Sequence, residues 1–193
     1  MGHMSTVPGT RAEASQRVRD AIVAAAVKIV ARDGVAAVTH RRLAVEADVS
    51  LSSTTWHFAT KNDILEAALD WTAQHEVASI AAIADRLGGT AFDPAAWAEE
   101  LADWLIGQVT TERDVAVALY RLQIELADSP GARRTHHEWG RGLRSVAETV
   151  APELDIRLIV AALDGLRLSV LLSGEDPGWL RDAVRRQLQA LLG

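Results

Sequence analysis

Residues 47–58, ADVSLSSTTWHF, gather side chains whose chemistry suits contact with DNA. Five of them carry hydroxyl groups, and an aromatic residue, a histidine and Phe58 follow. Serine and threonine are short enough to let a helix enter a major groove, and their hydroxyls can bond base edges and phosphates. The methyl groups of Leu51 or a threonine can also contact a thymine methyl. The alternative is that these hydroxyls only cap and line a surface turn.

Basic residues on either side extend the candidate surface. Arg41 carries a forked guanidinium that can bond O6 and N7 of guanine. Trp56, His57 and Lys61 are expected where the phosphate backbone passes, whereas Phe58 is expected to turn into the core. The candidate DNA-contacting residues are therefore Thr39, Arg41, Arg42, Ser50, Ser52, Ser53, Thr54, Thr55, Trp56, His57 and Lys61.

Two short helices are predicted to hold these residues. Thr39 can cap the first, whose inward residues are Leu43, Ala44 and Ala47, and Ser50 can cap a second that runs to about residue 57. Two such helices joined by three residues make a helix-turn-helix. The turn needs a left-handed backbone, which Asp48 tolerates better than most residues.

The rest of the chain also shows helical periodicity. A first helix is expected over residues 15–33, ended by Gly34, and a long one begins at Asn62 and ends at Gly88 and Gly89. Further helices are expected at about 94–109, 112–128, 131–150, 155–173 and 177–192, with breaks at 128–131, Pro152 and 173–178. No segment alternates as a strand does. The predicted fold class is all-α: a disordered tail at 1–10 that starts with a cloning remnant, a three-helix head at 11–61, and a larger helical domain at 62–193 for ligand binding and dimerisation.

Charge is distributed unevenly along the 193 residues. The net charge is −6, but residues 1–61 hold eight Lys and Arg against five acids, a balance of +3 that leaves −9 for the remainder. A basic head on an acidic body is expected when one end of a protein meets phosphate. There is no cysteine, so disulfides and thiolate metal sites are excluded, and no export signal or membrane span is evident, so a cytoplasmic location is expected.

Residues 31–69, ARDGVAAVTHRRLAVEADVSLSSTTWHFATKNDILEAAL, resemble the DNA-binding head of the tetracycline-repressor (TetR) family. The shared features are a Gly after the first helix, a capping Thr, Leu-Ala, Val-Ser at the turn, and an aromatic residue with His-Phe before a Lys. The resemblance implies that Thr39, Arg41, Ser50, Ser52, Thr54, Thr55, Trp56, His57 and Lys61 lie at or near double-stranded operator DNA. Asp48 and Ser52 replace usual glycines, Thr54 a usual aliphatic residue and Thr55 a usual Tyr, which removes one expected phosphate contact.

The helix expected at 155–173 suits a homodimer interface. It is apolar on more than one face, and Ala161, Gly165 and Ser169 form a line of small residues four apart that permits close helix approach. The resemblance implies that the last two helices pair across a four-helix interface; the alternative is packing within one chain. The candidate interface residues are Ile156, Val160, Ala161, Leu163, Gly165, Ser169, Val184 and Leu188.

Large aromatic and polar residues in the body are candidate walls of a small-molecule pocket. Six tryptophans favour an aromatic or flat apolar ligand, although aromatics at helical spacing also form plain cores. The resemblance implies that an effector bound there changes the spacing of the two heads and releases DNA. The candidate residues are Trp71, His75, Trp97, Leu101, Trp104, Gln108, Tyr120, Gln123, His137 and Trp139.

Catalytic and metal-binding motifs are not found. His75-Glu76 and His137-Glu138 lack a second His at the spacing of zinc proteases, and no phosphate loop or Gly-x-Ser-x-Gly occurs. We therefore expect no enzyme activity, no cofactor and no metal. The prediction is a ligand-released repressor that binds a palindromic operator. Two alternatives stay open: a helical ligand-binding or enzymatic protein with a non-functional head, and a DNA-binding dimer without effector.

Overall fold

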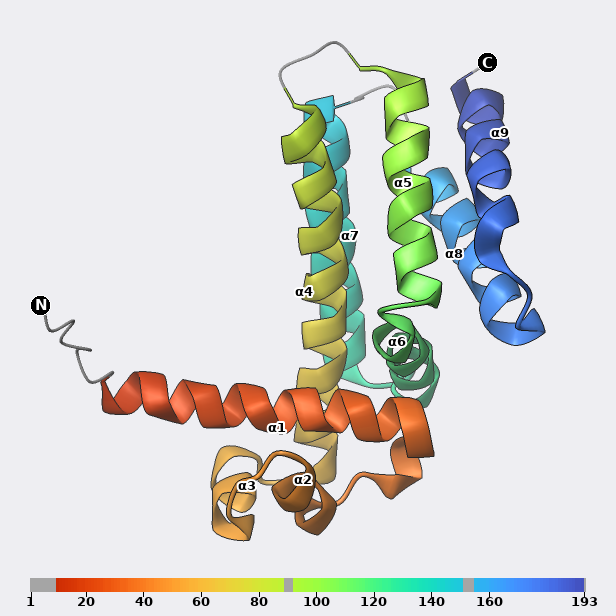
Figure 1. The fold of residues 1–193 in the computed structure, drawn as a ribbon. Coiled ribbons are helices and arrows are strands. Elements are labelled where there is room, and N and C mark those ends of the chain that lie inside the picture. The colour runs from red at the N-terminus through yellow and green to blue at the C-terminus, as the bar shows by residue number, and fades with distance from the viewer. Residues whose placement is uncertain (1–9, 89–91, 151–154, 193) are drawn as a thin grey trace, which may run out of the picture.

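The computed structural model describes residues 10–88, 92–150 and 155–192, which contain helices and no strand (Figure 1). The α-helices are α1 (Arg11–Asp33), α2 (His40–Glu46), α3 (Leu51–His57), α4 (Lys61–Leu87), α5 (Pro94–Val109), α6 (Arg113–Glu125), α7 (Pro130–Val150), α8 (Ile156–Ser173) and α9 (Leu180–Leu192), with 3-10 turns at Val35–Ala37 and Pro177–Trp179. The prediction of an all-α fold is confirmed. None of the described helices is long and apolar enough to cross a membrane.

The helices form a small head beneath a taller body (Figure 1). Helix α1 crosses the lower end of α4, with α2 and α3 beneath it, and α4 rises beside α7. Helix α5 packs against α9 and α8 on the other side of the body. Helix α6 lies between the two parts, where it packs on α1.

Helix boundaries follow local capping chemistry. The Thr39 and Ser50 hydroxyls accept hydrogen bonds from the backbone N–H of Arg42 and Ser53, so both predicted caps are confirmed. Between the two helices, Asp48 has a φ of 51°, the left-handed backbone that the turn requires. Gly34 ends α1 with a φ of 85°.

Three predicted helix starts are wrong. The helix expected from residue 177 begins as the 3-10 turn Pro177–Trp179, and α9 starts at Leu180. Helix α1 begins at Arg11, because Thr10 and Glu13 form a reciprocal capping box; Thr10 is thus part of the helix cap rather than of a tail. Helix α4 is capped by Thr60 and not by Asn62, since the Thr60 hydroxyl accepts from the Asp63 N–H at 3.1 Å and the Asp63 carboxylate accepts from the Thr60 N–H at 2.8 Å. Residues 1–9 and the predicted break at Pro152 lie outside the described residues.

One apolar core joins the head to the body. Ile22 and Ile29 of α1, Leu43 of α2 and the aromatic ring of Phe58 pack in one cluster with Leu122 of α6. Phe58 therefore lies in the core, as predicted. A second cluster fills the upper body and joins α5, α8 and α9. Because α6 contributes to the head core, a displacement of α6 must be accommodated by the head.

Candidate DNA-binding helix and ligand cavity

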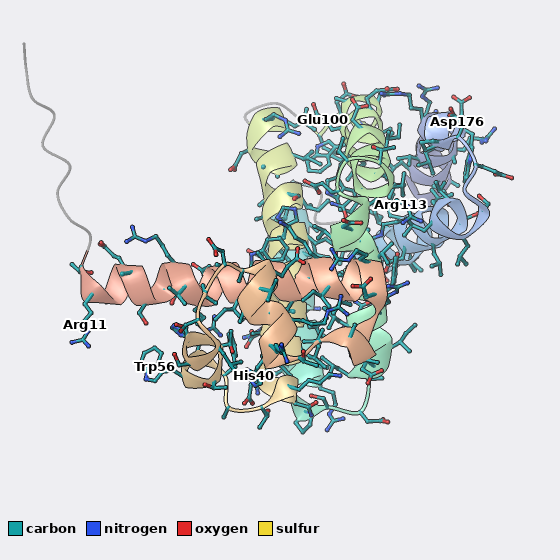
Figure 2. All side chains as sticks on the ribbon, turned by 60° about the horizontal axis from the view of Figure 1, so that its bottom comes forward. Arg11, His40, Trp56, Glu100, Arg113 and Asp176 are labelled. Carbon is teal, nitrogen blue, oxygen red and sulfur yellow. The ribbon has the colours of Figure 1, made fainter. Side chains whose placement is uncertain are left out.

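Helix α3 presents its outer surface to solvent. Leu51 and Trp56 are 52% and 74% exposed, and Ser52 and Thr55 are also exposed. Figure 2 shows Trp56 projecting outward from the head. Ser50 is exposed, whereas Ser53 and His57 are half-buried. In a helix-turn-helix, the second helix is the one that enters a major groove, and α3 keeps its outer side chains free for that contact.

Thr54 does not belong to that surface. Its side chain is fully buried, and its hydroxyl donates to the Leu51 carbonyl at 2.8 Å and lies 3.3 Å from Nδ1 of His40. The prediction that Thr54 contacts DNA is therefore wrong. It faces α2 instead, where it links the two helices of the motif.

The basic residues of the head differ in availability. Thr39, Arg41 and Lys61 are exposed, and no ion pair within the described residues engages Arg41 or Lys61. Arg42 instead pairs with Asp33, which also binds Arg32 at 3.0 Å. Arg41 is therefore the long cationic side chain best placed to reach a base, and Arg42 braces α2 against α1.

An apolar cavity lies in the body between α4, α5, α7, α8 and α9. Its empty volume is about 750 Å³, including the opening to solvent. Four of the predicted ligand-binding residues line it: Trp97, Leu101, Trp104 and Trp139. The indole N–H of Trp104 is buried and has no hydrogen-bond partner in the described part of the chain. The cavity therefore has an aromatic wall formed by three tryptophans.

Charged groups lie at one end of this cavity. The carboxylates of Glu76 and Asp164 line it, and both bind the buried Arg167, Glu76 at 2.7 Å. Trp139 donates its indole N–H to Glu76 at 2.9 Å. Burial by itself lowers the pKa of Arg167. Glu76 and the other neighbours raise that pKa by a larger amount, so the net shift is upward and the guanidinium stays charged. Two carboxylates and one guanidinium leave one excess negative charge.

Two other predicted ligand residues belong to this polar cluster rather than to the apolar wall. Tyr120 accepts from Nε of Arg167 at 2.8 Å and donates to Asp164 at 3.2 Å. Burial raises the pKa of Tyr120 to about 12, so its phenol stays neutral. Gln108 is buried and donates to Glu112 at 2.6 Å.

The remaining candidates lie apart from the aromatic cavity. Gln123 and His137 line a second, more open cavity that shares Trp139 and Asp164 with the first. Trp71 and His75 stack with ring centroids 5.2 Å apart, and His75 lies 3.3 Å from Glu112. The residues predicted from the sequence to form one ligand pocket therefore lie in several places, including two cavities and a stack at the surface. The prediction missed Glu76, Asp164 and Arg167, although an Arg within an apolar helix indicates a buried partner.

The predicted dimer residues divide between interior and surface. Leu163, Val184 and Leu188 are buried in the core of their own chain, so their assignment to a partner contact is wrong. Ile156 and Val160 line the aromatic cavity together with Leu163 and Leu188. Ala161, Gly165 and Ser169 are exposed, on the face of α8 that also exposes Leu158, Leu168 and Leu172.

Helix α6 connects the cavity to the head. Tyr120 donates to Asp164, which lines the cavity, and the next residue, Arg121, donates from Nη1 to the carbonyls of Val30 and Ala31 at 2.7 and 2.8 Å. Those carbonyls lie in the last turn of α1, where a cation is favoured by the helix dipole. A helix-turn-helix head joined in this way to a cavity-bearing helical body defines a helical DNA-binding regulator.

Comparisons with known proteins agree. Residues 22–68 match the family described as bacterial regulatory proteins, tetR family, and residues 92–193 match the tetracyclin repressor-like C-terminal domain. Because the second match covers more than half of the chain, the protein belongs to the TetR family. An HTH-type transcriptional regulator from Saccharopolyspora erythraea is 44% identical over 52 residues, which are 27% of this chain and 22% of that relative.

Solved structures extend the likeness over the whole fold. A TetR-family member from Streptomyces coelicolor A3 is 31% identical, with a TM-score of 0.71 over 88% of this chain and 97% of that one. The multidrug binding protein EbrR, in complex with malachite green, is 34% identical, with a TM-score of 0.66 over 90% of this chain and 96% of that one. Both likenesses extend over head and body.

Proposed function

We propose that this protein is a dimeric transcriptional repressor that binds a palindromic operator and releases it when a small molecule occupies the aromatic cavity. The observation that carries the proposal is the position of α6, where Tyr120 is bonded to the cavity residue Asp164 and Arg121 is bonded to the last turn of α1. A ligand that binds more tightly to one position of α6 than to another shifts the protein toward that position. Because α6 is bonded to α1, the head moves with it.

Operator recognition is assigned to α3 and Arg41. Selection of the purified protein on random duplex DNA is expected to enrich a palindrome, because twofold dimers bind half-sites about one helical turn apart. Replacing Arg41 with alanine is expected to weaken binding by about 1–3 kcal/mol and to relax selectivity at one base pair per half-site. Quantitative binding to operators with single base changes measures both effects. Unchanged selectivity would show that Arg41 does not contact a base.

Dimerisation is assigned to the exposed face of α8. Leu158, Leu168 and Leu172 lie there beside the small residues Ala161 and Gly165. An exposed apolar helix face with small residues permits close approach of a second copy. The domains proposed from the sequence, a head at 11–61 and a body at 62–193, then have separate roles in DNA binding and in ligand binding and dimerisation.

The proposed ligand is an aromatic cation. Flat rings suit the slot between Trp97, Trp104 and Trp139, and the excess negative charge of Glu76, Asp164 and Arg167 suits one positive charge. Malachite green, which EbrR binds, is an aromatic cation.

Neutralising a cavity carboxylate tests this ligand class. Glu76→Gln is expected to weaken malachite green binding by roughly tenfold or more, because the charged end then carries no excess negative charge. Asp164→Asn gives a milder variant, since Asp164 is partly exposed. Calorimetry without DNA measures the affinities, and Glu125→Gln, an exposed site away from the cavity, is the matched control. Equal affinity of all four proteins would exclude charge recognition.

A further inference from the structure

Helix α3 lacks the side chains that usually distinguish bases by hydrogen bonding. Guanine is bound in the major groove by Arg or Lys, and adenine by Asn or Gln. Helix α3, Leu51–His57, contains none of these four residue types. Its exposed side chains are Leu51, Ser52, Thr55 and Trp56. Apart from the half-buried His57, base selectivity from α3 must therefore come from hydroxyl groups or from apolar contact.

The hydroxyl groups are already engaged within the helix. Oγ of Ser50 lies 2.8 Å from Oγ of both Ser52 and Ser53 and accepts from the Ser53 N–H at 3.0 Å. The Thr55 hydroxyl lies 3.1 Å from the Ser52 carbonyl and 3.3 Å from that of Leu51, to which it donates. A hydroxyl carries one hydrogen, so Thr55 cannot donate to a base without losing its bond to the helix.

The large exposed side chains of α3, Leu51 and Trp56, are mainly apolar, and they give α3 a substantial apolar surface toward DNA. Leu51 lies at the start of the helix and is half-exposed, and Thr55 follows one turn later on the same face. With its hydroxyl bonded to the backbone, Thr55 keeps its methyl group for contact. Trp56 lies edge-on to His57, with ring centroids 4.6 Å apart, on a neighbouring part of the helix.

The thymine C5-methyl is the apolar group that a base pair presents in the major groove. We propose that α3 recognises thymine methyl groups, and that Leu51 and Thr55 make this contact in each half-site. This inference rests on the proposed function as a DNA-binding repressor. It assigns guanine recognition to Arg41 and thymine recognition to α3.

Uracil substitution tests the proposal on the selected operator. Deoxyuridine pairs as thymidine does and lacks only the C5-methyl. Each lost methyl contact is expected to weaken binding about threefold to fourfold. Replacing the contacted thymine in both half-sites therefore weakens binding roughly tenfold. Each thymine is replaced in turn, with its symmetry mate, and affinity is measured by fluorescence anisotropy.

Leu51→Ala shows whether the penalty belongs to this residue. The variant is expected to bind the thymine and uracil operators within twofold of one another, whereas Val45→Ala, an aliphatic change at a more exposed side chain on α2, is expected to keep the roughly tenfold gap. Circular dichroism confirms that both variants are folded.

The outcomes separate this inference from the proposed function. An operator that is bound specifically, but that contains no thymine or tolerates uracil at every position, would overturn thymine-methyl recognition and leave the repressor intact. A gap that persists in Leu51→Ala would overturn the assignment to Leu51. Failure to select any operator would overturn both proposals.

Discussion

Operator binding is expected to weaken about ten-thousand-fold when monovalent salt rises from 50 to 200 mM. The reason is counterion release: if each head neutralises about four phosphates, the dimer releases ions from about eight, and affinity falls steeply with salt. The acidic body acts in the opposite direction, because added salt screens the repulsion between its negative charge and the DNA.

Anisotropy titrations at four salt concentrations measure the slope. Lys61→Gln is expected to make the slope of log affinity against log salt concentration shallower by about two for the dimer, one for each lost phosphate contact. Arg113→Gln is the matched control, since Arg113 lies on the body away from α3 (Figure 2). A nearly flat response of the wild type would contradict binding through the phosphate backbone.

Replacing Arg167 with methionine is expected to destabilise the fold by about 3–5 kcal/mol. Arg167 is 2% exposed, and its loss leaves Glu76, which is 6% exposed, as a buried carboxylate without its cation. Asp164 loses the same partner at lower cost because it is partly exposed and can be hydrated. The melting temperature is expected to fall by roughly 10 °C.

A second substitution separates charge from packing. In the double variant Glu76→Gln, Arg167→Met, most of the lost stability is expected to return, since no unpaired buried charge remains. Urea unfolding of the four proteins completes the cycle. If Arg167→Met costs less than about 1 kcal/mol, or if the double variant is no more stable, the ion pair is not what Arg167 contributes.

The sequence predicted local features well, because their causes are local. Thr39, Ser50 and Gly34 each act on a backbone within three or four residues, and Asp48 carries the left-handed turn by itself. Thr60 was missed because Asn62 is an equally good capping residue two positions later. Local preference alone does not choose between them.

Sites that depend on distant contacts could not be predicted in the same way. Glu76 and Arg167 are 91 residues apart, and nothing in either neighbourhood identifies the other. Leu163 and Leu188 satisfy the pattern of an interface helix, yet the same pattern describes a helix that packs on its own core and lines a cavity. Thr54 resembles its exposed neighbours in type, and only its packing beside His40 of α2 shows that it faces inward.

Release of the operator by malachite green tests the central claim most directly. Labelled operator is bound by the wild type and by Glu76→Gln at equal saturation, and the dye is added while anisotropy is followed. We predict release from the wild type at a dye concentration at least about tenfold below that needed for the variant. Equal release from both proteins, which would mean that the dye acts on DNA, or no release from the wild type, would contradict ligand-controlled binding.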